Sequence, residues 1–116
     1  MNPNLRACIA HVAARLSGVG VNSAVYDYSQ SKHIHVSGNV SATAVNVYDH
    51  DRGAHLTGSP ANLYDHGLGG HISLNLNGAQ FSGYDHRSGY HYQGTINGSS
   101  VTVYDYESGQ HHQFNV

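Results

Sequence analysis

The sequence predicts an all-β fold with one short N-terminal helix, in which an antiparallel meander of about ten short strands is closed into a barrel or strongly curled. Three observations lead to this prediction. A Tyr-Asp motif occurs five times, the segments on either side of it are typical of β-strands, and turn-forming residues come roughly every ten positions. Copies with a constant internal spacing indicate a repeated β-hairpin.

Composition limits the class of protein. The 116 residues suffice for one domain, and they include 11 histidines, 9 tyrosines and 14 glycines but only five basic and seven acidic side chains. With a net charge of −2 and scattered basic residues, the chain is not expected to bind nucleic acid. No apolar run approaches the ~18 residues of a membrane span. No signal peptide is recognised, because Arg6, His11 and Arg15 interrupt the first segment, and the compartment is not predicted.

Residues 1–18 depart from the repeat and are expected to form an amphipathic helix that packs on the sheet. Asn2 and Pro3 are typical of a helix start, and Gly18 of a helix end. The apolar residues at helical spacing are Leu5, Cys8, Ile9, Val12 and Leu16. The helix is expected to cover the apolar face of the sheet, or to fill the interior if the meander closes. As the single cysteine, Cys8 excludes an intrachain disulfide and is interpreted as a small core residue.

Residues 19–116 are expected to form a single β-repeat domain of five units with the pattern Tyr-Asp-(His/Tyr)-x-x-Gly-x-His. The motif pairs are Tyr26-Asp27, Tyr48-Asp49, Tyr64-Asp65, Tyr84-Asp85 and Tyr104-Asp105. The histidines seven residues after each tyrosine are His33, His55, His71, His91 and His111. The residues five positions after each tyrosine are Ser31, Gly53, Gly69, Gly89 and Gly109. Asp and Gly are turn residues, so each unit predicts two strands joined by a tight turn in which the Asp side chain accepts backbone N–H groups.

The turn within each unit allows two registers. A type I turn with a glycine bulge places Asp49 opposite His55. A plain four-residue turn instead places Tyr48 opposite His55 and Val47 opposite Leu56. We favour the second register, because it keeps the apolar strand residues on one face.

Further turns join one unit to the next. The joining sequences are Ser59-Pro60, Asn77-Gly78 and Asn97-Gly98, and Asn-Gly favours a two-residue type I′ hairpin. These turns predict the pairs Leu56 with Leu63, Leu76 with Ala79 and Tyr92 with Val103. They also place each histidine opposite the tyrosine of the next unit, as with His71 and Tyr84.

The two faces of the predicted sheet differ in chemistry. The apolar face carries Ile34, Val36, Val45, Val47, Leu56, Leu63, Ile72, Leu74, Leu76, Phe81, Tyr92, Ile96, Val101, Val103 and Phe114. The other face carries an alternating row made of Tyr26, His33, Tyr48, His55, Tyr64, His71, Tyr84, His91, Tyr104 and His111. Side chains opposite each other lie about 5 Å apart, within reach of aromatic contact or a hydrogen bond.

This composition favours a non-enzymatic binding or structural module. Tyrosines interleaved with Asn, Ser, Gly and His form surfaces that bind ligands at low entropic cost. The ligand-binding candidates are Tyr48, Tyr64, Tyr84 and Tyr104. A carbohydrate, a peptide or another copy of the chain could occupy this face. An enzyme is not expected, because an active site is one asymmetric arrangement whereas this Tyr, His and Asp trio occurs five times.

The alternative function is transition-metal binding by the histidine-rich face. Neutral imidazole is a common ligand of zinc, nickel and copper, and cross-strand histidines can converge on one ion. The candidate pairs are His50 with His55, His66 with His71, and His86 with His91. The simpler interpretation of the same residues is an aromatic, hydrogen-bonded ladder repeated for packing. His111 and His112 are interpreted as a solvated strand end.

Overall fold

The computed structural model describes residues 1–116 and contains one helix, α1 (Pro3–Leu16), followed by eleven strands. The strands are β1 (Ala24–Asp27), β2 (Lys32–Val40), β3 (Val45–Asp49), β4 (Ala54–Ser59), β5 (Asn62–Asp65), β6 (Gly70–Ile72), β7 (Asn75–Asn77), β8 (Gln80–Asp85), β9 (Tyr90–Asn97), β10 (Ser100–Asp105) and β11 (Gln110–Asn115). All strand pairings are antiparallel, which confirms the predicted all-β meander with a helix before it.

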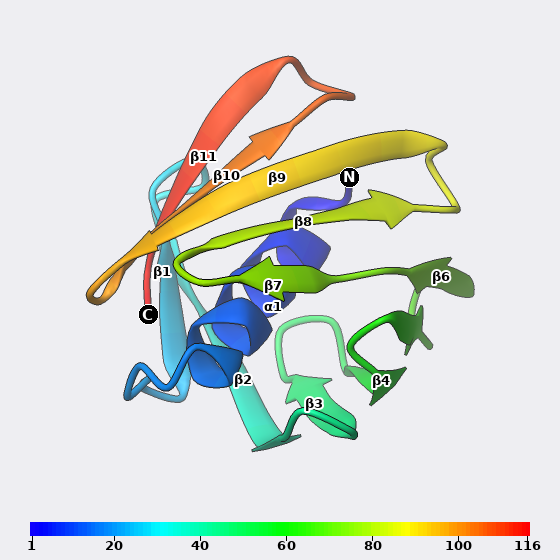
Figure 1. The fold of residues 1–116 in the computed structure, drawn as a ribbon, viewed down its shortest axis with the longest axis horizontal. Coiled ribbons are helices and arrows are strands. Elements are labelled where there is room, and N and C mark those ends of the chain that lie inside the picture. The colour runs from blue at the N-terminus through cyan, green and yellow to red at the C-terminus, as the bar shows by residue number, and fades with distance from the viewer.

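The meander closes into a barrel (Figure 1). Strands pair with their neighbours in the chain, except that β6 and β7 do not pair with each other, and β1 pairs with β11, with Tyr26 opposite Asn115. The short strands β6 and β7 both pair with β8, so they occupy one position in the barrel wall. This leaves no long strand edge unpaired, which is how barrels solve the edge problem of open sheets.

The register within each unit is the one predicted. Tyr48 lies opposite His55 and Val47 opposite Leu56. The same pairing joins Tyr26 with His33, Tyr64 with His71, Tyr84 with His91 and Tyr104 with His111. The turn requires a left-handed residue at its end, where Gly53 has φ of +67°. In the first unit Ser31 takes this place with φ of +54°, the one non-glycine residue of the chain with positive φ.

The predicted register between units is wrong by two residues. Leu56 lies opposite Asp65 instead of Leu63, Leu76 opposite Phe81 instead of Ala79, and Tyr92 opposite Asp105 instead of Val103. The physical reason is the turn type. Gly78 and Gly98 stand first in their two-residue turns with φ of +64° and +60°, while the residues after them have negative φ, as in a type II′ turn.

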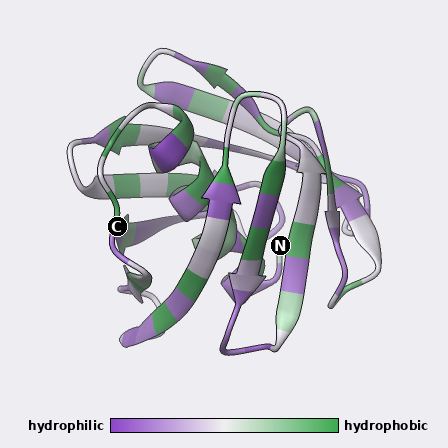
Figure 2. Cartoon of the chain, turned by 90° about the horizontal axis from the view of Figure 1, so that it is seen from below, coloured by the Kyte–Doolittle hydropathy of each residue, from purple (hydrophilic) through white to green (hydrophobic).

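A shift of two residues keeps each side chain on its predicted face but breaks the continuous Tyr–His row. Thr57, not a histidine, lies opposite Tyr64 of the next unit, and His71 is no longer opposite Tyr84. Adjacent hairpins are therefore staggered, and stagger is what a sheet needs to close into a barrel. The apolar face forms the interior: of the fifteen residues predicted for it, all are buried except Leu76, which is half-buried. Figure 2 shows hydrophobic and hydrophilic bands alternating along several strands.

Helix α1 fills the barrel interior, the second of the two predicted placements. Every residue from Asn4 to Ala14 is buried, including the polar residues Asn4, Arg6 and His11. Burial extends beyond the apolar face predicted for an amphipathic helix, because the strands surround the helix. The helix begins as expected, with the Asn2 side chain accepting hydrogen bonds from the backbone N–H groups of Asn4 and Leu5 at 2.9 and 3.2 Å. No helix is long and apolar enough to cross a membrane.

Candidate functional site

Each repeat presents one tyrosine and two aromatic neighbours on the outer face of the barrel. The Tyr48 ring contacts those of His50 and His55, with ring centroids 4.8 and 4.6 Å apart. The units of Tyr64 and Tyr84 repeat this arrangement at 4.7 to 4.9 Å. The aromatic ladder expected within each unit is therefore present, and such contacts stabilise a pair by about 1 kcal/mol.

The candidate metal-binding histidines all lie exposed on this outer face. Both histidines of each pair pack on the tyrosine of their own unit. The Nε2 atom of His50 also lies 2.7 Å from Ser37 Oγ, and that of His66 lies 2.8 Å from Thr57 Oγ1. No group of three or more His, Cys, Asp or Glu side chains is placed to hold a metal ion. Binding of zinc, nickel or copper by these pairs stays a prediction.

The five repeated aspartates point into one end of the barrel and are buried. In each turn the Oδ1 atom accepts backbone hydrogen bonds, as Asp65 does from Gly67 and Leu68 at 2.9 and 3.0 Å. The other turns use the same contact at Asp27, Asp49, Asp85 and Asp105. These hydrogen bonds confirm the turn role predicted for the motif aspartates.

We call the five carboxylates at this end of the barrel the aspartate rim (Asp27, Asp49, Asp65, Asp85 and Asp105). Cationic and amide side chains donate hydrogen bonds to them. Arg52 Nε donates to Asp49 Oδ2 at 2.6 Å, and its Nη2 donates to Asp65 Oδ2 at 2.8 Å. From inside, Asn4 donates to Asp49 at 3.2 Å, and Arg6 donates to Asp105 at 3.3 Å. The rim therefore holds the N-terminal end of α1 in the barrel.

The rim aspartates and the cations that pair with them stabilise each other's charged forms. Burial alone would raise the pKa of Asp105, but hydrogen bonds from the Met1 amino group and the Glu107 backbone, together with the charge of Arg6, hold it below its usual value. Burial alone would lower the pKa of Arg52, but hydrogen bonds to Asp65 and Asp49 hold it above its usual value. The aspartates thus act as structural anions and are turned away from the outer face.

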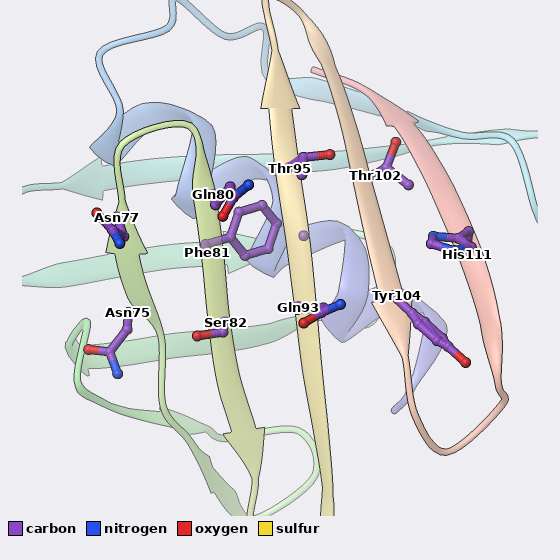
Figure 3. A pocket seen from close by; sticks show the side chains of 11 residues that line it. Asn75, Asn77, Gln80, Phe81, Ser82, Gln93, Thr95, Thr102, Tyr104 and His111 are labelled. Carbon is purple, nitrogen blue, oxygen red and sulfur yellow. The ribbon is translucent and has the colours of Figure 1, made fainter.

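A groove lies on the outer face of β7 to β11 (Figure 3). Its volume is about 580 Å³, within the ~300–1,000 Å³ range of small-ligand sites. The lining residues are Asn75, Asn77, Gln80, Phe81, Ser82, Gln93, Gly94, Thr95, Thr102, Tyr104 and His111. None of them is an Asp, Glu, Lys or Arg, and most are amides and hydroxyls.

Close packing shapes the floor of this groove, named here the amide groove. A side chain at Gly94 would meet the Phe81 ring at 2.2 Å, so glycine is what lets Phe81 extend beneath β9. At one end, the rings of Tyr104 and His111 stack with centroids 4.7 Å apart and an interplanar angle of 24°. Together they make a flat aromatic wall beside the amides.

The amide groove continues toward a second aromatic cluster. A neighbouring depression of about 670 Å³ shares Asn75, Ser82 and Gln93 with it. The aromatic residues lining this depression are Tyr84, Tyr90, His91, Tyr92 and Tyr106. An extended surface results, in which uncharged polar side chains lie beside a row of aromatic rings, because Tyr106 of the depression packs on Tyr104 of the groove with ring centroids 4.8 Å apart.

Of the four predicted ligand-binding tyrosines, Tyr84 and Tyr104 line this surface, whereas Tyr48 and Tyr64 lie on the other units. The amides Asn75 and Gln93 were not among the predicted ligand-binding residues. Their one sequence signal is the run of amide and hydroxyl side chains at alternating, outward positions of the last strands. The interpretation of His112 as solvated is wrong: it is buried, with Nδ1 2.8 Å from Ser29 Oγ.

Two buried side chains, Cys8 and His11, are uncharged inside the barrel near neutral pH. Burial raises the pKa of the Cys8 thiol to about 12, so the thiol stays protonated and unreactive. Burial, with the charge of Arg15 adding to it, lowers the pKa of His11 to about 4. His11 is therefore neutral inside the barrel at neutral pH.

This shift predicts a loss of stability in acid. An unfolded histidine titrates near pH 6.5, so between pH 6.5 and 4 the unfolded chain binds a proton that folded His11 refuses. We expect His11 alone to lower the free energy of unfolding by about 2 kcal/mol between pH 7.5 and 5. Urea unfolding at both pH values should show a smaller loss for His11→Gln. The exposed His55→Gln is the control and should keep the wild-type loss. An unchanged loss in His11→Gln would contradict the prediction.

Comparisons with protein-family models, with curated proteins and with solved structures give no match for this chain. Its function is therefore argued from the geometry described above.

Proposed function

We propose that this protein is a non-enzymatic binding module that holds an uncharged carbohydrate chain in the amide groove. The observation that carries the proposal is the lining of the groove: uncharged amides and hydroxyls beside a row of aromatic rings. A carboxamide offers two donors and one acceptor, and a hydroxyl offers both functions, which matches the alternating donors and acceptors of sugar hydroxyls.

The aromatic side chains beside the amides also suit a sugar. The Tyr104–His111 wall and the cluster around Tyr84 offer flat, apolar faces, and the C–H face of a pyranose ring is the corresponding surface on a sugar. Because Tyr106 packs on Tyr104, these rings form one extended row beside the polar side chains, which suits a chain of several sugar units better than a single one. The exposed Tyr90 and Tyr106 add contact area that no interior packing uses.

Binding without cleavage is favoured by the position of the acids. Glycoside hydrolysis generally uses two carboxyl groups flanking the bond, about 5–9 Å apart. No Asp or Glu lines the amide groove, and the nearest motif aspartates, Asp85 and Asp105, face the interior. This arrangement supports a site that retains its ligand unchanged.

The proposal is tested with neutral polysaccharides as probes. In native gels cast with a soluble β-glucan, a mannan or a galactan, the wild-type protein should migrate more slowly in at least one gel. Gln93→Ala and Asn75→Ala should each weaken binding about tenfold, because each removes a side chain with hydrogen bonds of about 1 kcal/mol or more to the ligand.

Asn62→Ala is the matched control, because Asn62 is an exposed strand amide outside the groove. It should bind as the wild type does. Failure of all three polysaccharides to slow the protein, or equal weakening by Asn62→Ala, would contradict the proposal. Retardation by a peptide library or concentration-dependent migration alone would instead favour peptide binding or self-association.

A further inference from the structure

A second cavity lies at the opposite end of the barrel from the aspartate rim, beside the C-terminal end of α1. We call it the distal pocket. It has a volume of about 570 Å³ and is lined by the end of the helix, the segment 18–23 and part of β2. Its apolar lining residues are Val19, Val21, Val36 and Val40. This cavity shares no lining residue with the amide groove.

His11 lines the distal pocket without any hydrogen-bond partner. Its side chain is 2% exposed, and neither Nδ1 nor Nε2 has a hydrogen-bonding neighbour in the protein. A neutral imidazole carries one N–H donor and one acceptor nitrogen. Leaving such groups buried and unpaired is unfavourable, by about 1–3 kcal/mol for each group. Both nitrogens are closed off from solvent, so a turn of the ring toward the pocket would bring an unpaired N–H into reach of something that enters it.

Arg15 supplies charge on the same side of the helix. It stands four residues after His11, which puts the two side chains on one helix face. Its Nη1 atom donates to the Gly38 carbonyl at 2.7 Å, and it forms no ion pair with any carboxylate. No acidic residue lines the pocket. The guanidinium therefore retains free donors and an uncompensated positive charge at the pocket wall.

We propose that the distal pocket binds a small monocarboxylate with a short aliphatic tail. The carboxylate accepts hydrogen bonds from the guanidinium of Arg15 and, once the His11 ring turns toward the pocket, from its ring N–H, and the tail lies against the half-buried Val19, Val21 and Val40. The C-terminal end of α1 carries about half a negative charge, which the full charge of Arg15 outweighs. Because the pocket supplies a positive charge and hydrogen-bond donors, binding should require the ionised carboxylate of the ligand.

The test is an NMR titration of the intact protein with butyrate at pH 7.5. Butyrate should shift the ring signals of His11 and the methyl signals of Val21 and Val36 in a saturable way. Butyramide has the same size and no charge, and sulfate has charge and no tail, so each should bind at least about tenfold more weakly. Loss of one charge-assisted hydrogen-bond pair justifies that factor.

Variants separate this site from general effects. Arg15→Gln changes a partly exposed side chain and should weaken butyrate binding about tenfold, while Arg87→Gln, an exposed arginine on another turn, should leave it unchanged. The proposal is overturned if butyrate leaves the His11 signals unmoved, if butyramide or sulfate binds as tightly, or if Arg15→Gln binds like the wild type. Polysaccharide retardation should persist in Arg15→Gln, because the two sites are separate.

Discussion

Replacing Arg52 with glutamine is expected to lower the free energy of unfolding by about 3 kcal/mol or more, among the largest effects of any single substitution in this protein. Arg52 is largely buried and bridges Asp49 and Asp65, whose side chains are 1% and 0% exposed. Glutamine cannot supply the charge, so two buried carboxylates lose their shared cation. Urea unfolding at pH 7 measures the effect.

Arg87→Gln is the matched control for this prediction. Arg87 occupies the corresponding turn of another repeat but is exposed and forms no ion pair. Its replacement should change stability by less than about 0.5 kcal/mol. Equal effects of the two substitutions would show that the carboxylates of the rim do not need Arg52.

Replacing Gly83 with alanine is expected to lower the free energy of unfolding by about 3 kcal/mol, because the added methyl group would push the strands apart where β6 and β7 meet β8. A methyl group at Gly83 would lie 1.9 Å from the Ser73 carbonyl oxygen and 2.5 Å from the Tyr92 hydroxyl. That hydroxyl donates to the same carbonyl at 2.7 Å. Burial, with the charge of Asp85 adding to it, raises the pKa of Tyr92, so this donor is kept near neutral pH.

The control for Gly83→Ala is Gly20→Ala. A methyl group at Gly20 meets nothing within 4 Å, and its backbone does not require a positive φ. Thermal unfolding should therefore show a clear drop in Tm for Gly83→Ala and almost none for Gly20→Ala. A Tm for Gly83→Ala within a degree or two of the wild type would mean that this junction relaxes at little cost.

Much of the fold follows from periodicity. The spacing of the Tyr-Asp motif defines the hairpins, and the rule that apolar residues share a face selects the correct turn within each unit. That rule could not select the turn between units, because a shift of two residues leaves the faces unchanged. The choice depended on whether Asn77 or Gly78 stands first in the turn, and Asn-Gly favours the other type.

The interior of the barrel was harder to predict. The helix was recognisable, but its polar residues suggested a solvated face. In the structure Arg6 pairs with Asp105, and the alanines on the remaining sides are small enough for strands to pack all round. This closure depends on contacts between residues about a hundred positions apart, which local pattern does not reveal.

The candidate site was predicted in part. Tyr84 and Tyr104 were singled out because they repeat, and both lie on the proposed binding surface. Asn75 and Gln93 do not repeat, so a search for repeated chemistry passes over them. The groove lies on one side of the barrel, so its residues are those in which the repeats differ. Which of these residues lie together can be seen only once the strands are placed side by side.

The pairing of β1 with β11 has a consequence for how the molecule forms. Each repeat can form its hairpin from neighbouring residues, but the last pairing joins segments separated by almost the whole chain, and long-range closure of this kind slows folding. During synthesis, α1 and the first hairpins emerge well before β11 exists to complete the wall. The apolar inner surface and the central helix therefore stay open to solvent until β11 has been synthesised, so this is the period in which the protein is most prone to aggregate.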